Sequence, residues 1–147
     1  MNQIRSVTNV TNVERNEMTT QSSDVVYESE VSTVGEDAAS MVEGGVLIFF
    51  ADPCPAALAE VSVVHRPTGP ATRAPEPGDV VQLGDKGVRI TKVGDLAGTN
   101  LQELGHVVVY LDPAENVKLL PGAIHAHGTL DLPAPGMRFT IHTGSAE

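Results

Sequence analysis

The chain has 147 residues, of which 9 are Lys or Arg and 19 are Asp or Glu, so its formal net charge is -10. The length and a hydrophobic fraction of 41% predict one compact domain, and the negative charge argues against nucleic acid as a partner. The longest apolar run, residues 46–51, is far shorter than the roughly 20 residues of a membrane-spanning helix, so we expect a cytoplasmic protein that is not embedded in a membrane.

The N-terminal residues 1–23 are polar, with only scattered Val and Ile, and carry too little apolar surface to offset the entropy of ordering. We therefore expect a disordered leader, with Met18 as a second candidate start, followed by a domain over 24–147. In this domain, runs rich in β-branched residues alternate with turn signals and predict strands at 25–31, 46–50, 61–65, 79–83, 88–93, 106–111, 117–120 and 137–142. Many short strands at such spacing predict an all-β fold, either a barrel or a sandwich.

Turn chemistry separates these strands. The dipeptide Pro-Gly occurs at 77–78, 121–122 and 135–136, and it predicts a type II turn because proline presets φ at the second position and glycine supplies positive φ at the third. The sequence GDKG at 84–87 predicts a hairpin turn.

Two segments have helical signals. Residues 52–60 offer Asp52 as an N-cap with prolines in the first turn, and residues 95–105 end on Gly105, a candidate left-handed stop. The prediction from the residues alone is an all-β barrel with these two short helical insertions.

His65 ends the apolar run 61–65 and precedes a loop rich in Pro and Arg. Strand alternation places it on the face of Val61 and Val63, nominally the inward one. Two interpretations stay open from the residues alone. The ring is either a core-edge histidine with both nitrogens satisfied by backbone, or a nucleophile or ligand at a barrel mouth, where Arg66, Thr68 and Arg73 could donate to an anion.

The other histidines carry weaker signals. His106 opens a predicted strand just after a helix stop, and a structural role is the more common one for such a residue. His125 and His127 share one strand face, a spacing a metal site could use, but only Asp131 lies close downstream, so we expect no metal. The single cysteine, Cys54, excludes an internal disulfide and has no local base.

Two stretches, 93–112 and 119–141, make the chain similar to a known family. The most specific pattern is Val-Gly-x-x-Ala-x-x-Asn-x-x-Glu-Leu-Gly-His, present from Val93 to His106 and followed by Pro-Gly at 121 and 135. Upstream, VLIFFADPCPAALAEVSVVH at 46–65 is similar to an apolar strand, a Pro-Ala turn and a strand ending in histidine. On these residues, about 25–143 resemble the IIA component of the glucitol/sorbitol-specific phosphotransferase system.

The resemblance implies a closed β-barrel of complex topology and a cytoplasmic phosphocarrier that needs no cofactor. It would accept a phosphoryl group from the histidine-containing phosphocarrier protein and pass it to the IIB part of the IIB/IIC sorbitol permease. His65 matches the phospho-acceptor, and His106 and His125 match histidines expected nearby as supporting residues. Arg66 and Thr68 are our candidates for binding the phosphoryl oxygens.

A phosphohistidine relay needs a neutral imidazole, so partial burial of His65 would help by disfavouring the charged ring. The second ring nitrogen needs an acceptor, for which a backbone carbonyl is preferred over Glu103. The loop after His65, at 66–78, is richer in Pro and Arg than the family leads us to expect. An orphan barrel that acts as a regulatory or binding module without sugar transport is therefore the alternative function.

Overall fold

The structure is a computed structural model, and it describes residues 25–144. The predicted leader, 1–23, and the alternative start at Met18 lie outside these residues. In chain order the elements are β1 (Val25–Val34), α1 (Ala38–Glu43), β2 (Val46–Ala51), α2 (Ala56–Ala59), β3 (Val63–Pro67), β4 (Val80–Leu83), β5 (Lys86–Val93), α3 (Ala97–Leu104), β6 (Val107–Leu111), β7 (Ala123–His127) and β8 (Arg138–His142). None of the helices between residues 25 and 144 has the length and hydropathy needed to cross a membrane.

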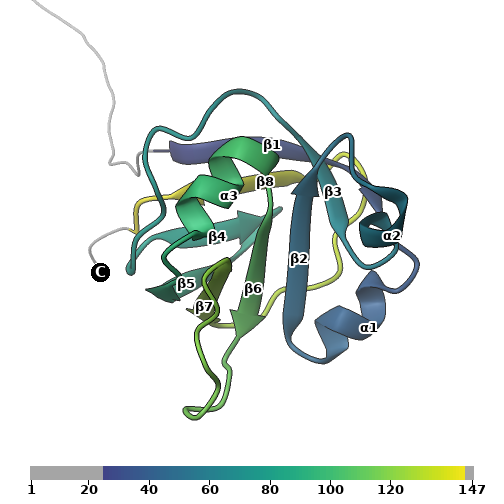
Figure 1. Cartoon of the computed structure of the whole chain (residues 1–147). Coiled ribbons are helices and arrows are strands. Elements are labelled where there is room, and N and C mark those ends of the chain that lie inside the picture. The colour runs from purple at the N-terminus through teal and green to yellow at the C-terminus, as the bar shows by residue number, and fades with distance from the viewer. Residues whose placement is uncertain (1–24, 145–147) are drawn as a thin grey trace, which may run out of the picture.

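The eight strands close into one barrel in the order β1-β3-β2-β6-β7-β5-β4-β8, and β8 pairs back onto β1 (Figure 1). The β2/β3 and β6/β7 pairs are parallel, and the other six pairs are antiparallel. Closure leaves no free sheet edge, which removes the edge as a site of aggregation. The predicted fold class, a closed all-β barrel of complex topology with short helices, is confirmed.

The barrel interior is filled by alternate residues of every strand. Phe49 of β2 and Phe139 of β8 stack at its centre, with ring centroids 4.2 Å apart and planes inclined by 10°. Around them lie buried Val, Ile and Leu side chains from the remaining strands and Leu101 of α3. The same alternation directs His65 of β3 inward, into this apolar interior.

Several local predictions were wrong. Residues 117–120 form no strand, because β7 takes the place beside β6 and leaves Val117 and Leu120 exposed in the connection. The helix at 38–43 was not predicted. Gly78 and Gly136 have the positive φ of the predicted turns, but Gly122 does not.

The two predicted helices fared differently. Residues 97–104 form α3, and Gly105 ends it with φ of 62°, as predicted. The earlier segment forms only the single turn α2, which begins after Pro55, so Asp52 is not its N-cap. The chain bends at Asp52 and Pro53, and Pro55 is extended (φ -56°, ψ 141°), so the helix begins only at Ala56.

The barrel is built from two similar halves. In the first half, β1, α1 and β2 are followed by β3, which pairs antiparallel with β1 and parallel with β2. In the second half, β5, α3 and β6 are followed by β7, which pairs antiparallel with β5 and parallel with β6. Matching hydrogen bonds join Gly35 N to Ser62 O (2.9 Å) and Gly94 N to Ala123 O (2.8 Å). The sequence repeats Val-Gly at 34–35 and 93–94, and Asp-Pro at 52–53 and 112–113. These repeats indicate a duplicated strand-helix-strand framework.

Candidate functional site

His65 lies inside the barrel and not at its rim. β3 continues for two residues beyond it, so the predicted strand end is displaced to Pro67. Its side chain is 0% exposed, and its ring makes T-shaped contacts with Tyr27, Phe49 and Phe139 at centroid distances of 6.0, 6.2 and 5.0 Å. Such a shell of aromatic edges and faces holds the imidazole in one orientation.

Two hydrogen bonds define the tautomer of His65. Its Nε2 lies 2.8 Å from the carbonyl oxygen of Gly105, and because a carbonyl only accepts, Nε2 carries the proton. Nδ1 lies 2.6 Å from Oγ of Ser29, so the Ser29 hydroxyl donates to the Nδ1 lone pair. The acceptor that orients the imidazole is thus a backbone carbonyl, as predicted from the sequence, and not the Glu103 carboxylate.

Burial keeps this ring neutral. Desolvation lowers the pKa of His65 to about 4, although the hydrogen bond to Gly105 acts in the opposite direction by favouring the protonated ring. At neutral pH the side chain is therefore an uncharged imidazole with one lone pair, which is the form a nucleophile requires.

A surface pocket of about 330 Å³ lies next to the His65 ring. Two of the groups that touch the ring also line this pocket: Gly105, which accepts from Nε2, and Tyr27, whose ring packs against the imidazole. The remaining walls come from the ends of β2 and α3 and from the loop after β3. The Nε2 edge of His65 is therefore separated from solvent by a single layer of the chain.

His106 lies at the start of β6 and shares two neighbours with His65. Its Nδ1–H donates to the carbonyl of Phe49 (3.0 Å), and its ring packs on Phe50 with centroids 5.1 Å apart. Phe49 also contacts His65, and Gly105 precedes His106 directly. His106 is half-buried, and its fixed Nδ1–H tautomer leaves the lone pair on Nε2.

His125 belongs to a different part of the barrel. It lies on β7, packs against Tyr110 at 5.6 Å and lines a groove with Lys92 and His127. Burial and the nearby Lys92 ammonium lower its pKa. Its position does not bring it to His65.

The neighbouring His127 bonds through Nδ1 to Asp112 Oδ1 (2.6 Å). Within residues 25–144, no three His, Cys, Asp or Glu side chains are grouped in a way that could hold a metal ion.

The two candidate phosphoryl ligands point away from His65. Alternation turns Arg66 outward, where it pairs with Asp52 (3.2 Å) while 72% exposed. Thr68 Oγ1 donates to the carbonyl of Glu28 (3.2 Å). Both line a shallow groove on the outer side of β1 and β3, opposite to the face on which His65 lies.

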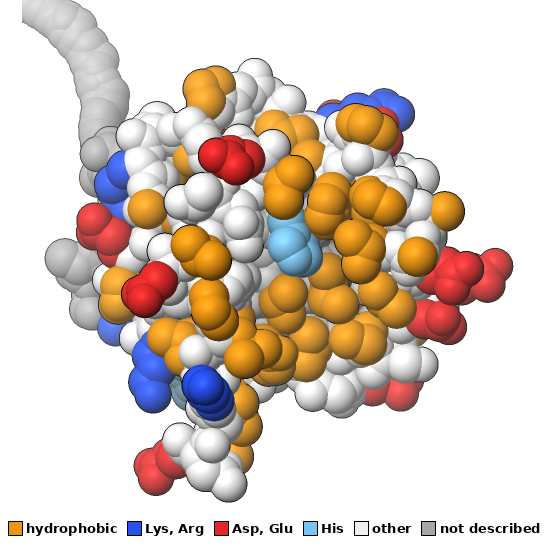
Figure 2. Space-filling view, viewed as in Figure 1, with side chains coloured by type: hydrophobic (Ala, Val, Ile, Leu, Met, Phe, Trp, Pro, Cys, Tyr) orange, Lys and Arg blue, Asp and Glu red, His pale blue; other side chains and the backbone are white. Residues whose placement is uncertain are grey.

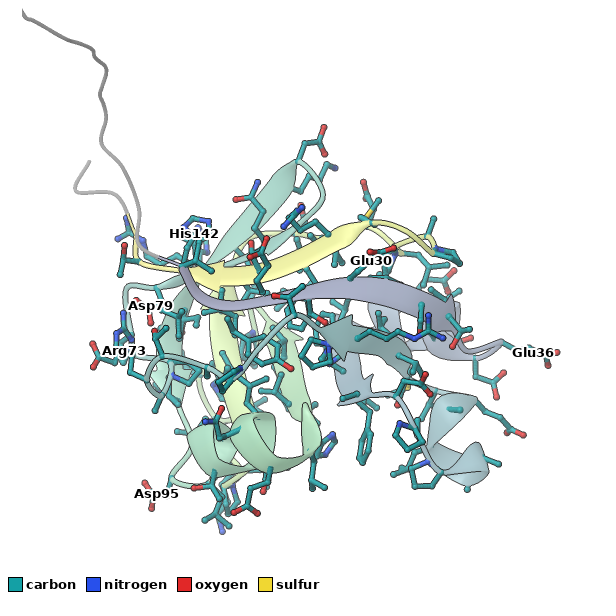
Figure 3. All side chains as sticks on the ribbon, turned by 90° about the horizontal axis from the view of Figure 1, so that it is seen from above. Glu30, Glu36, Arg73, Asp79, Asp95 and His142 are labelled. Atoms are coloured by element: carbon teal, nitrogen blue, oxygen red, sulfur yellow. The ribbon has the colours of Figure 1, made fainter. Side chains whose placement is uncertain are left out.

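The loop between β3 and β4 is held by several hydrogen bonds, among them those of Thr68 N–H and Thr72 N–H to the carbonyls of Glu28 and Val26 on β1 (2.9 Å each). Ala71 N–H donates to Oε1 of Gln102 on α3 (2.8 Å), and Arg73 makes a two-pronged ion pair with Asp79 at 2.9 and 3.0 Å. The Asp79 carboxylate is almost fully buried, and Figure 3 shows it beside Arg73 at one end of the barrel. The proline-rich loop is therefore fixed against α3 near the pocket.

An apolar face surrounds His106. The outward residues of β2 and β6 form cross-strand pairs, Val46 with Tyr110 and Ile48 with Val108, and all four are half-exposed. Phe50 continues this row beneath His106. Figure 2 shows the result: hydrophobic side chains gather around an imidazole on the face that carries β2 and β6 in Figure 1, with acidic groups at the margin.

Sequence reasoning missed Tyr27 and Ser29 of β1. Both are buried, at 3% and 1% exposure, and both contact His65. The sequence contains a pattern that could have found them. Tyr27, Ser29 and Val31 are spaced two residues apart and so share one face of the strand, which places two hydroxyl groups on the face that is turned to the core. Buried polar side chains are uncommon enough to mark a site.

Comparisons with known proteins identify the fold and the family of the chain. The barrel is similar to the crystal structure of the PTS system IIA component from Enterococcus faecalis V583, with a TM-score of 0.68 and 21% identity over 76% of this chain and 96% of that one. The fold is thus that of a phosphotransferase-system IIA component.

The sequence comparisons narrow the class. The model of the family "PTS system glucitol/sorbitol-specific IIA component" matches residues 26–140. The glucitol/sorbitol-specific EIIA components of Shigella flexneri and Escherichia coli (strain K12) are each 34% identical over 113 residues, which cover 76% of this chain and 90% of each relative. The chain belongs to the glucitol/sorbitol-specific IIA component family.

Proposed function

We propose that this protein is a working cytoplasmic phosphocarrier that takes a phosphoryl group onto His65 and passes it on for glucitol/sorbitol uptake. The donor is the histidine-containing phosphocarrier protein, and the acceptor is the IIB component of the sorbitol permease. The observation that carries the proposal is the neutral, oriented imidazole of His65, whose contacts Tyr27 and Gly105 line a surface pocket, in a chain of this family.

The transfer uses a lone pair of the His65 ring. The Nε2 edge faces Gly105, which lines the pocket, whereas the Nδ1 edge faces Ser29 in the core. We therefore assign the attack to Nε2. Nε2 must first separate from the Gly105 carbonyl. When the site opens, the Nε2 proton passes to water and Nδ1 takes a proton from water, so the ring changes tautomer without a change of charge. The Ser29 oxygen then accepts a hydrogen bond from Nδ1–H, because a hydroxyl both donates and accepts.

The phosphoryl transfer itself forms one bond and breaks one, and it needs no cofactor. The Nε2 lone pair forms a bond to phosphorus, the donor's P–N bond breaks, and its electron pair returns to the donor nitrogen. The Nδ1–H bond to Ser29 holds the positive charge that develops on the ring. Transfer onward to IIB repeats these steps in reverse, with Nε2 as the leaving nitrogen.

Opening of the site is part of this mechanism. The 0% exposure of His65 means that no donor reaches Nε2 until the Gly105–His106 segment or the pocket wall moves. His106 is the supporting residue best placed to follow that movement, because it adjoins Gly105 and keeps a free Nε2 lone pair. Arg66 and Thr68 would need to leave Asp52 and Glu28 to reach phosphoryl oxygens.

The apolar face around His106 is the proposed docking surface for both protein partners. Its half-exposed valine, isoleucine and tyrosine side chains offer area that association can bury. The chain's net charge of -10 would favour encounter with a partner that presents basic residues around an apolar centre.

The test is intact-mass measurement after mixing the protein with phosphoenolpyruvate, enzyme I and the phosphocarrier protein. We expect one acid-labile phosphoryl group on the wild type, none on His65→Ala, and one on the control His142→Ala, which removes a histidine from β8 on the other side of β1. Labelling that survives in His65→Ala would move the acceptor elsewhere. If the wild type gains nothing from a competent donor, the chain is a regulatory or binding module instead.

A further inference from the structure

Tyr27 has a hydroxyl without a partner. The side chain is 3% exposed, and its oxygen is a buried polar atom that makes no hydrogen bond within residues 25–144. Most buried hydroxyls are paired because an unpaired one loses its bonds to water without replacement. Ser62 Oγ and His125 Nε2 are also buried without a partner within these residues, but of the three only Tyr27 both contacts the His65 ring and lines the pocket.

The position of Tyr27 identifies that partner. Its ring lies edge-on to His65, with centroids 6.0 Å apart and planes inclined by 81°, and Tyr27 also lines the pocket next to the Nε2 edge. A phosphoryl group on Nε2 would occupy this pocket. Its three oxygens accept hydrogen bonds, and the side chains named so far offer few donors there, because Ser29 is engaged with Nδ1 and Arg66 faces outward.

We propose that Tyr27 Oη is the hydrogen-bond donor for the phosphoryl group on His65, and that it stabilises both the transferring group and the phosphohistidine. This inference rests on the proposed function. No bond of Tyr27 breaks: Nε2 gains phosphorus, the donor nitrogen keeps the electron pair of its broken P–N bond, and the tyrosine keeps its proton throughout.

The chemistry of the buried phenol fits a donor. Burial raises the pKa of Tyr27 to about 12, so the hydroxyl is protonated at every pH at which the relay operates. It cannot act as a base or repel the phosphoryl charge. A neutral donor held next to the ring can stabilise the negative charge of the phosphoryl oxygens once the site has opened, which is the principle of electrostatic stabilisation in enzyme sites.

Tyr27→Phe tests the proposal, with Ser62→Ala as the matched control. Ser62 directly precedes β3 and, like Tyr27, has a buried hydroxyl without a hydrogen-bond partner within residues 25–144, but it does not line the pocket. Rates of phosphoryl uptake are measured by rapid-quench with labelled phosphoenolpyruvate, and the half-life of the phosphohistidine is measured after the donor is removed. Thermal unfolding and the ³¹P shift of the phosphorylated proteins are recorded in parallel.

We expect Tyr27→Phe to slow uptake by about 10- to 100-fold and to shift the ³¹P signal, as loss of one charge-facing donor does. Its thermal stability should equal or exceed that of the wild type, because the lost hydroxyl had no partner, whereas a merely structural tyrosine would lower stability and leave the ³¹P signal unchanged. Ser62→Ala should accept phosphoryl at the wild-type rate and give the wild-type ³¹P signal.

Wild-type uptake and an unchanged ³¹P signal in Tyr27→Phe would overturn this inference while the proposed function stands. Failure of the wild type itself to accept phosphoryl would overturn both.

Discussion

The burial of a neutral His65 predicts a specific loss of stability in acid. The pKa of this ring is lowered from 6.5 to about 4 in the folded protein. At pH values between these two, the unfolded chain therefore binds a proton that the folded protein does not bind. Stability therefore falls as pH decreases through this window. From the two pKa values, the loss between about pH 7.5 and about pH 5 is about 2 kcal/mol, most of the full difference of about 3 kcal/mol.

The assay is urea unfolding followed by far-ultraviolet circular dichroism at several pH values in this range, where most carboxylates stay ionised. We expect wild type to lose stability with falling pH and His65→Gln to lose about 2 kcal/mol less, whatever its stability at neutral pH. His125→Gln is the comparison variant. The pKa of His125 is also lowered, so this histidine too destabilises the folded protein in acid, but from a site away from His65. Identical pH slopes for wild type and His65→Gln would refute the buried neutral imidazole.

Two further predictions concern the surroundings of the ring. Gly105→Ala should destabilise the protein by about 1–3 kcal/mol and reduce phosphoryl uptake. Gly105 has φ of 62°, and a Cβ at this position would lie 2.4 Å from the Cβ of Ala51. A free energy of unfolding and an uptake rate equal to those of the wild type would contradict this. Ile48→Glu, on the apolar face, should keep the fold but raise the KM for the phosphocarrier protein about tenfold or more. Leu132→Glu, at an exposed hydrophobic position in the segment before β8, is its control and should leave KM unchanged.

Local patterns in the sequence were sufficient for much of the fold. β-Branched runs and Pro-Gly turns located seven of the eight strands, because period-2 alternation and turn chemistry act over a few residues. The errors came from longer-range effects. Residues 117–120 have the composition of a strand but no neighbouring strand to pair with. The short helix at 38–43 has no side-chain cap from which its start could have been predicted.

The candidate site was predictable only in part. Alternation correctly turned His65 inward, yet its full burial depends on closure of the barrel, which brings β1 and the end of α3 onto the ring. Ser29 and Gly105 are 36 and 40 residues away from it in sequence, so no local pattern pairs them. Arg66 and Thr68 were chosen for proximity in sequence, and the same alternation that turns His65 inward turns Arg66 outward.

The duplicated framework has a consequence for how the site could have arisen. In register, the position of His65 on β3 corresponds to Ala126 on β7, since Asp52 N bonds to the carbonyl of His65 (2.9 Å) as Asp112 N does to that of Ala126 (2.8 Å). One half thus contributes the His65 ring, and the other contributes Gly105, whose carbonyl covers it. Ala126, at the position equivalent to His65, has no side-chain nitrogen, so under the proposed function the barrel has one phospho-acceptor although its framework is duplicated. Neither half alone would then form the site, and the whole barrel would carry one phosphoryl group at a time.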